Sequence, residues 1–206
     1  ELHEASRYHF DLDRRDVLKA LGGGVVVCLL AGPARGQQRG RGGRGGGGNR
    51  PQHIGGWLHI GDDGQIALYS GKTEVGQNVR TSVAQAAAEE LRVEPAAIRT
   101  VLADTDIVPD EGGTSGSRST PSTIPQIRRV AAAARELLLE LAAERWKVEP
   151  KSLALASGKV THGASGRSLS FGELTRGQKL TKEVGGSVEV TPTDNWRVLG
   201  KSTPKA

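Results

Sequence analysis

A run of small residues that leads directly into a long amphipathic helix constrains the fold of this chain most. Residues 112–123 hold three glycines, four serines, three threonines and Arg118. Apolar residues then recur on one stripe across residues 124–146, which predicts a long helix. Small residues let backbone N–H groups approach a phosphate, and a helix N-terminus adds positive potential. The pattern predicts an anion site, whereas the alternative is a flexible turn with a helix N-cap at Ser122 or Thr123.

A second glycine-containing sequence follows a predicted β-hairpin. Residues 57–61 and 65–71 alternate apolar and polar side chains around an Asp-Asp-Gly turn, as hairpin strands do. The chain then continues as Lys-Thr-Glu-Val-Gly-Gln over residues 72–77. Gly76 would let the backbone approach a bulky ligand, and the Gln77 amide could donate to an oxo group or a pterin edge. The alternative interpretation makes Gly76 a simple break and Gln77 part of a helix N-terminus.

The rest of the periodicity predicts an α+β fold with a small mixed sheet and two main helices. Apolar residues at four-residue spacing predict a helix from about residue 78 to residue 92. From residue 177 onward the pattern weakens. The other expected elements are a strand at 98–103, a hairpin formed by 153–156 and 159–162, and a short helix at 171–176.

Charge and cysteine content exclude several classes of site. The net charge is +5, but residues 1–50 carry nine Lys and Arg against five Asp and Glu, so the remainder is nearly neutral. We therefore expect no nucleic-acid surface on the folded part. Cys28 is the single cysteine, and the five histidines show no ligand spacing. This chain can therefore supply neither an iron–sulfur cluster nor a zinc site based on cysteine.

The N-terminal segment has the pattern of an export leader. An adjacent arginine pair at residues 14–15 precedes an uncharged, mostly apolar stretch at 20–34. The pair resembles the twin-arginine type of leader, so we expect residues 1–36 to direct export to the periplasm. Cleavage would follow Ala34 or Gly36. The alternative is an uncleaved anchor that keeps the protein associated with the membrane.

The predicted leader is followed by three further regions. Residues 37–52 are rich in Gly and Arg and are expected to form a flexible linker, although such tracts can also bind RNA. We expect a folded domain over 53–195, beginning near His53, and an extended connector over 196–206. The connector predicts that a further domain follows.

Three short segments, in this order, resemble the molybdenum hydroxylases, the family of xanthine dehydrogenase and aldehyde oxidase. They are residues 71–77, the Asp-Thr-Asp sequence at 104–106, and residues 113–120 before the long helix. The resemblance is to the N-terminal portion of the molybdopterin-binding large subunit, and the leader makes the isoquinoline 1-oxidoreductase beta subunit the most similar branch. The Asp-Thr-Asp segment taken alone is most simply a solvated loop.

The resemblance implies two contacts with the cofactor. Gln77 would lie beside the apical oxo group of the molybdenum, and Gly76 would allow the close approach. The phosphates of molybdopterin cytosine dinucleotide would be held by Gly116, Ser117, Arg118, Ser119 and Thr120.

The resemblance also implies a reaction and partners. The family oxidises a carbon of an N-heterocycle or an aldehyde with oxygen derived from water, and passes electrons to [2Fe–2S] clusters. Its general-base glutamate belongs to a glycine-rich motif that is absent here. We therefore expect no catalytic residue and no direct metal ligand in this chain, which would be inactive alone. Its partners would be the remainder of the large subunit, a small [2Fe–2S] subunit and a cytochrome-like acceptor. The alternative is a secreted anion-binding or interaction module without a redox cofactor.

Overall fold

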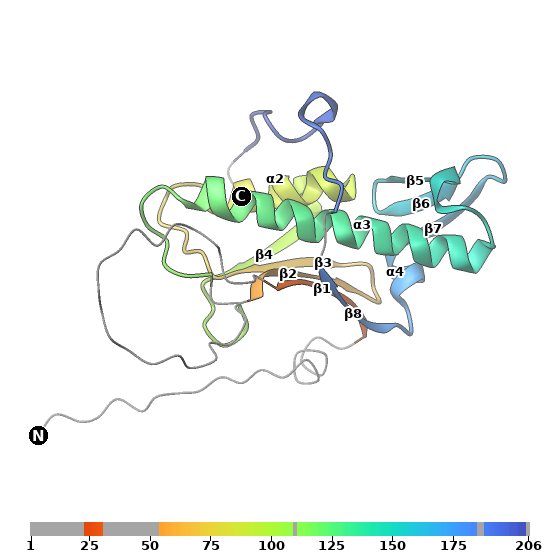
Figure 1. Ribbon diagram of the computed structural model, residues 1–206, viewed down its shortest axis with the longest axis horizontal. Helices are drawn as coiled ribbons and strands as arrows, with labels where there is room; N and C mark the ends of the chain where they lie inside the picture. The colour runs from red at the N-terminus through yellow and green to blue at the C-terminus, as the bar shows by residue number, and fades with distance from the viewer. Residues whose placement is uncertain (1–22, 31–53, 109–110, 185–187, 205–206) are drawn as a thin grey trace, which may run out of the picture.

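The computed structural model describes residues 23–30, 54–108, 111–184 and 188–204. Within them a five-stranded sheet has the strand order β4-β3-β2-β1-β8. The two long helices, α2 (Val79–Leu91) and α3 (Ile124–Trp146), cover the same face of this sheet (Figure 1). The strands are β1 (Gly24–Leu30), β2 (Ile54–Gly61), β3 (Ile66–Ser70), β4 (Ile98–Leu102) and β8 (Lys179–Val184).

The five-stranded sheet is mixed, because it contains both antiparallel and parallel strand pairs. β2 is antiparallel to both β1 and β3. β3 and β4 are parallel and are joined through α2 (Val79–Leu91), since a parallel connection needs a crossover. β1 and β8 are also parallel, although about 150 residues separate them in the sequence. The expected α+β class with a small mixed sheet and two main helices is confirmed.

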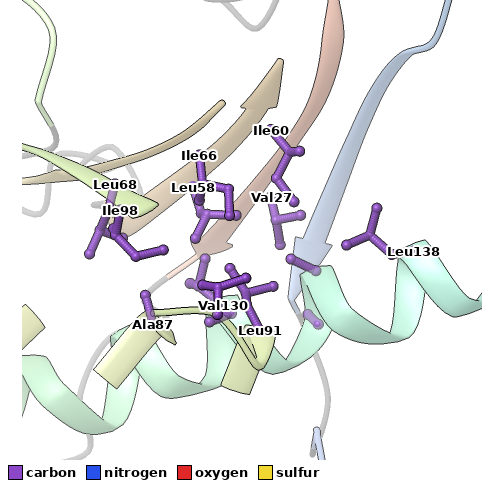
Figure 2. Packing of buried hydrophobic residues seen from close by; sticks show 14 of the residues in the cluster. Val27, Leu58, Ile60, Ile66, Leu68, Ala87, Leu91, Ile98, Val130 and Leu138 are labelled. Atoms are coloured by element: carbon purple, nitrogen blue, oxygen red, sulfur yellow. The ribbon is translucent and has the colours of Figure 1, made fainter. Parts of the chain in front are cut away.

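The main core lies between the sheet and α3 (Ile124–Trp146), and it rests on aliphatic side chains. Leu58, Ile60 and Leu68 of the hairpin are fully buried and point toward the two helices (Figure 2). The two helices contact each other, and both bury alanines, at 86–88 on α2 and at 131–134 on α3. Small residues let two helix backbones approach closely. Each buried Leu or Ile contributes about 1.5–3 kcal/mol.

A smaller sheet lies alongside the C-terminal half of α3 (Figure 1). It leads into α4 (Phe171–Thr175), which begins with a capping box between Ser170 and Glu173. Gly172 packs directly on the β2–β3 turn, where an added Cβ would lie 2.8 Å from the backbone nitrogen of Gly64. The strands of this sheet, in the order β5-β6-β7, are Leu153–Ala156, Lys159–His162 and Arg167–Ser170.

One predicted boundary is wrong. The folded part was expected to begin near His53, but β1 occupies residues 24–30 and pairs with β2 and β8. The apolar run that predicts an export leader also suits a strand buried on both faces, so periodicity could not separate the two. The arginine pair at 14–15 and the Gly/Arg-rich residues 37–52 lie outside the described residues. Among the described residues, no helix is both long and apolar enough to cross a membrane.

Two adjacent buried glutamates of α2 hold the C-terminal segment against the helices. Glu89 Oε2 accepts three successive backbone N–H groups, from residues 197, 198 and 199, at 2.7–3.0 Å. Burial alone would raise the pKa of Glu89, but these donors and Arg92 hold it below its ordinary value. Glu90 forms ion pairs with Arg128 and Arg135 of α3, at 2.9 and 2.7 Å. The start of the predicted connector is therefore bound to α2.

We predict that Glu90→Ala destabilises the chain by about 3–5 kcal/mol, because it leaves two partly buried guanidinium groups without their carboxylate. Glu140→Ala is the matched control, since Glu140 pairs with Lys182 while more than half exposed. That change should cost less than about 1 kcal/mol. Urea unfolding of both variants measures the difference. Equal losses of unfolding free energy would contradict the role assigned to Glu90.

Candidate functional site

A buried lysine joins the two glycine-containing sequences. Lys72 is 6% exposed and lies two residues after the end of β3. Its Nζ donates to three successive carbonyl oxygens, those of residues 111, 112 and 113, at 3.0, 3.1 and 3.5 Å. Beside it, the N–H of Thr73 donates to Thr114 Oγ1 at 2.9 Å. The segments at 71–77 and 112–120 therefore lie side by side, although about 40 residues separate them in the sequence.

The buried carboxyl group of Glu111 lies next to this junction. Ser70 Oγ donates to Glu111 Oε2 at 3.0 Å, while Glu111 Oε1 is buried without a hydrogen-bond partner among the described residues. Burial raises the pKa of Glu111 to about 7, against the lowering effects of Ser70, Lys72, the Gly71 N–H and the Thr123 hydroxyl. Thr123 precedes α3, so Glu111 connects the end of β3 to the start of that helix. Sequence reasoning missed Lys72 and Glu111, because a buried charge has no local sequence pattern.

The loop after Glu111 is exposed at residues 112–113 and 115–118. Gly112 and Gly116 have φ values of 72° and 63°, which glycine adopts without strain, and Ser117 has a φ of 53°. An added Cβ at Gly112 or Gly113 would meet no atom within 4 Å. Arg118 is exposed on the same loop. The loop therefore has open space beside Gly112 and Gly113, and it carries an exposed guanidinium.

The entry into α3 differs from the expected cap. A π-helical turn, Ser119–Thr123, precedes the helix, and neither Ser122 nor Thr123 makes a side-chain N-cap bond to α3. Instead the backbone N–H of Ser122 donates to the carbonyl of Arg118 at 2.9 Å. Helical backbone therefore begins at Ser119 rather than at the predicted cap. Such turns are frequent at functional sites. This turn also contacts α2, which follows Gln77 in the chain.

Gln77 is held within its own turn. Its Oε1 accepts the N–H of Val75, and its Nε2 donates to the carbonyl of Thr73, both at 2.7 Å. An amide nitrogen carries two N–H groups, so the bond to Thr73 uses one of the two. Gly76 has a φ of 100° and is exposed, with no atom within 4 Å of an added Cβ. The turn thus places the Gln77 amide next to an open stretch of backbone.

Glu74 is a residue of this turn that sequence reasoning missed. Its carboxylate accepts backbone N–H groups from Gly76, Asn78 and Arg80, at 2.8–3.1 Å. It thereby satisfies donors at the N-terminus of α2, which would otherwise lack partners. An acidic residue just before a predicted helix was the available signal. Because Glu74 accepts these donors, it fixes the turn that carries Gln77.

The carboxylates at 104–106 lie in an exposed turn and show no arrangement typical of a catalytic or metal site. Asp104 Oδ1 accepts the N–H of Asp106 at 3.2 Å in an exposed turn after β4. In the part of the chain that the structure describes, no three His, Cys, Asp or Glu side chains are grouped as a metal site. The donors at the junction are instead N–H groups, hydroxyls and one guanidinium, which suit an anion.

Comparison with known proteins identifies the class. Residues 21–205 match the sequence profile of the molybdopterin cofactor-binding domain, which covers most of the chain. The chain belongs to this family. It is a partial large-subunit domain of the molybdenum hydroxylase type, as the resemblance of residues 71–77 and 113–120 implied.

Relatives and a solved structure agree with this assignment. A nicotinate dehydrogenase subunit of Pseudomonas putida is 32% identical over 149 residues, covering 72% of this chain and 12% of that protein. The beta subunit of isoquinoline 1-oxidoreductase from Brevundimonas diminuta is 30% identical over 125 residues, covering 57% of this chain and 16% of that protein. A CO dehydrogenase structure from Oligotropha carboxidovorans aligns with a TM-score of 0.51 at 26% identity, over 57% of this chain and 15% of that chain. The chain thus spans less than a fifth of each of these proteins.

We predict that Lys72→Met loosens the junction. The change removes the ammonium group that holds residues 111–113, so amide hydrogen exchange should become at least about tenfold faster at Thr73 and Arg118. Core amides of α3 should keep their protection. Lys159→Met is the control, because Lys159 is an exposed lysine of β6. Unchanged exchange at Thr73 in Lys72→Met would show that the lysine does not hold the loop.

We also predict a pH dependence that originates at Glu111. Its raised pKa means that the folded chain binds this proton more tightly than the unfolded chain. The resulting stability is fully present below the ordinary value of 4.5 and is lost as the pH rises through about 7. Glu111→Gln stays neutral, so its stability relative to the parent should be greater at about pH 8 than at about pH 5. Urea unfolding at both pH values tests this, with exposed Glu94→Gln as control. A pH-independent difference would contradict it.

Proposed function

We propose that the junction of residues 71–77 with residues 112–120 holds the dinucleotide end and the pterin edge of a molybdenum cofactor. The observation that carries this proposal is the pair of contacts made by Lys72 and Thr73, which bring the two sequences together. The family match supplies the class of ligand. Neither sequence alone would be specific, since each resembles an ordinary turn.

The phosphate part of the ligand would lie on the loop. Gly116, Ser117, Arg118, Ser119 and Thr120 offer backbone N–H groups, hydroxyls and one guanidinium. Residues 112–123 contain no acidic side chain to repel an anion. A helix N-terminus contributes about 0.3–2 kcal/mol toward a negative charge, so the guanidinium and the loop amides must act with it. We propose molybdopterin cytosine dinucleotide as the form of the cofactor, as the resemblance of residues 116–120 to the family implies.

The second contact would be made by Gln77. Its amide lies next to Gly76, whose exposed backbone allows close approach. An N–H of the Gln77 amide would donate to an oxo group of the cofactor. The turn bonds of Gln77 and Glu74 fix this position before the ligand arrives. Such preorganisation reduces the entropy lost on binding.

The complete enzyme would oxidise a carbon of an N-heterocycle or an aldehyde, with oxygen from water. The names of two relatives, a nicotinate dehydrogenase and an isoquinoline 1-oxidoreductase, support the heterocycle. When bound, the cofactor would supply two-electron redox chemistry. This chain's residues would bind and orient it, without turnover on their own. The partners would be the rest of the large subunit, a small [2Fe–2S] subunit and a cytochrome or similar acceptor. The arginine pair at 14–15 supports export to the periplasm.

Cofactor analysis of the assembled enzyme that contains this chain tests the proposal. We predict that the assembled enzyme contains molybdenum and that acid hydrolysis of its cofactor releases cytidine monophosphate. Arg118→Ala should weaken cofactor retention by about tenfold to a hundredfold, the effect of one charge-assisted hydrogen bond. Exposed Arg167→Ala on β7 is the control. Gln77→Ala should keep the cofactor and lower the turnover rate.

Two outcomes would count against this assignment. An assembled enzyme that lacks molybdenum would reject the cofactor and favour a simple anion-binding module. Equal cofactor content in Arg118→Ala and Arg167→Ala would remove the loop from the phosphate site.

A further inference from the structure

We propose that residues 24–30 are a permanent strand of the mature domain and are not removed with an export leader. These residues lie inside the apolar stretch at 20–34 that predicts the leader, and they form β1. β1 is an inner strand of the sheet, between β2 and β8 (Figure 1). The proposal concerns processing of the N-terminus, so it does not depend on the cofactor.

Backbone pairing occupies both edges of β1. Val25, Val26 and Val27 pair with β2 on one side and with β8 on the other. Removal of β1 would leave the N–H and C=O groups along one edge of β2 without partners. It would also remove the strand with which β8 pairs. Loss of this strand therefore divides the sheet rather than shortening it at an edge.

Side-chain packing shows the same dependence. Val25 and Val27 are 1% and 0% exposed, and they belong to the core cluster that packs on α3. Figure 2 shows Val27 among these side chains. Leu58 of β2 pairs with Val27 and faces the same core. A chain without β1 would expose this face of α3 and the neighbouring side chains of β2. Apolar side chains of the predicted leader are therefore part of the core of the folded domain.

The start of β1 is fitted to its neighbour at the level of single atoms. Gly24 has a φ of 126°, and an added Cβ would lie 2.4 Å from the carbonyl oxygen of Ile60. Only glycine avoids that contact. His59 Nε2 lies 3.2 Å from the carbonyl oxygen of Gly23, within hydrogen-bond distance. Burial lowers the pKa of His59, which favours the neutral ring at this position.

The consequence is a competition for the same residues. Export machinery that recognises the apolar stretch needs residues 24–30 accessible, whereas the folded sheet buries them. Cleavage after Ala34 or Gly36 would detach β1 from the domain. β1 can therefore dock only after the export machinery has released it. Because cleavage would remove a strand that the sheet needs, β1 stays attached to the protein that folds.

The N-terminus of the folded protein tests the proposal directly. The full chain, with a C-terminal affinity tag, is produced in a bacterium that has twin-arginine export, and the folded protein is isolated. Intact mass and N-terminal peptide mapping should show an N-terminus before Gly24. A protein that begins at residue 35 or 37, and that unfolds at the same temperature as the uncleaved chain, would overturn the proposal.

A cross-link reports separately whether β1 is docked in solution. Cys28 is the single cysteine, and it pairs with Trp57 on β2 and with Glu183 on β8. Directly paired residues have Cα atoms about 4.5–5.5 Å apart in antiparallel strands and about 4.8 Å apart in parallel strands, which allows a disulfide. Diagonal neighbours lie at about 7–8 Å. Trp57→Cys should therefore lose its free thiols on mild oxidation at least tenfold faster than His59→Cys, the diagonal control.

A second cysteine pair, between β1 and β8, tests the same claim without replacing Trp57. Glu183→Cys should cross-link to Cys28 from the β8 side, even if replacing Trp57 prevents folding. Cross-linking of β1 to both neighbours in the folded chain supports a permanent strand. If the folded Glu183→Cys and Trp57→Cys variants retain their thiols as long as His59→Cys does, β1 is not a strand of the domain.

Discussion

The buried ammonium group of Lys72 is the interaction on which the candidate site depends. A desolvated charge is costly unless partners surround it, and here three successive carbonyl groups of the 111–113 segment provide them. This requirement fixes where the glycine loop begins. Together with the carboxyl group of Glu111, it sets the loop between the end of β3 and the start of α3. The exposed Gly116 and the Gln77 turn then lie on two segments that hydrogen bonds join at residues 72–73 and 111–114.

Much of the fold followed from local patterns. The helices α2 and α3, the β2–β3 hairpin and the β5–β6 hairpin each have a clear period and a recognisable turn, so their sequence alone predicts them. β1 and β8 could not be found in this way, because they form a parallel pair between the two ends of the chain. A strand that pairs over such a distance depends on tertiary context. An apolar run buried on both faces also has the composition of an export leader.

The candidate site likewise contains residues that the sequence indicated and residues that it did not. Gly76 and Gly116 have positive φ values in exposed turns, a conformation that glycine adopts without strain. The residues that bring these turns together, Lys72 and Glu111, gave no signal, because their significance lies in burial and long-range contact. Glu74 was detectable in principle as an acidic residue before a helix. The family match of residues 21–205 likewise places β1 within the domain, which the leader-like sequence concealed.

The most direct test of the central claim is a crystal structure of the assembled enzyme, with anomalous scattering used to locate molybdenum. The account predicts that the phosphates lie within hydrogen-bond distance of the loop amides at 116–120, and that the Gln77 amide lies against the metal's oxo group. It also predicts that Lys72 still holds the carbonyl groups of residues 111–113. A cofactor whose phosphates contact another part of the chain, with the 112–120 loop facing bulk solvent, would contradict it.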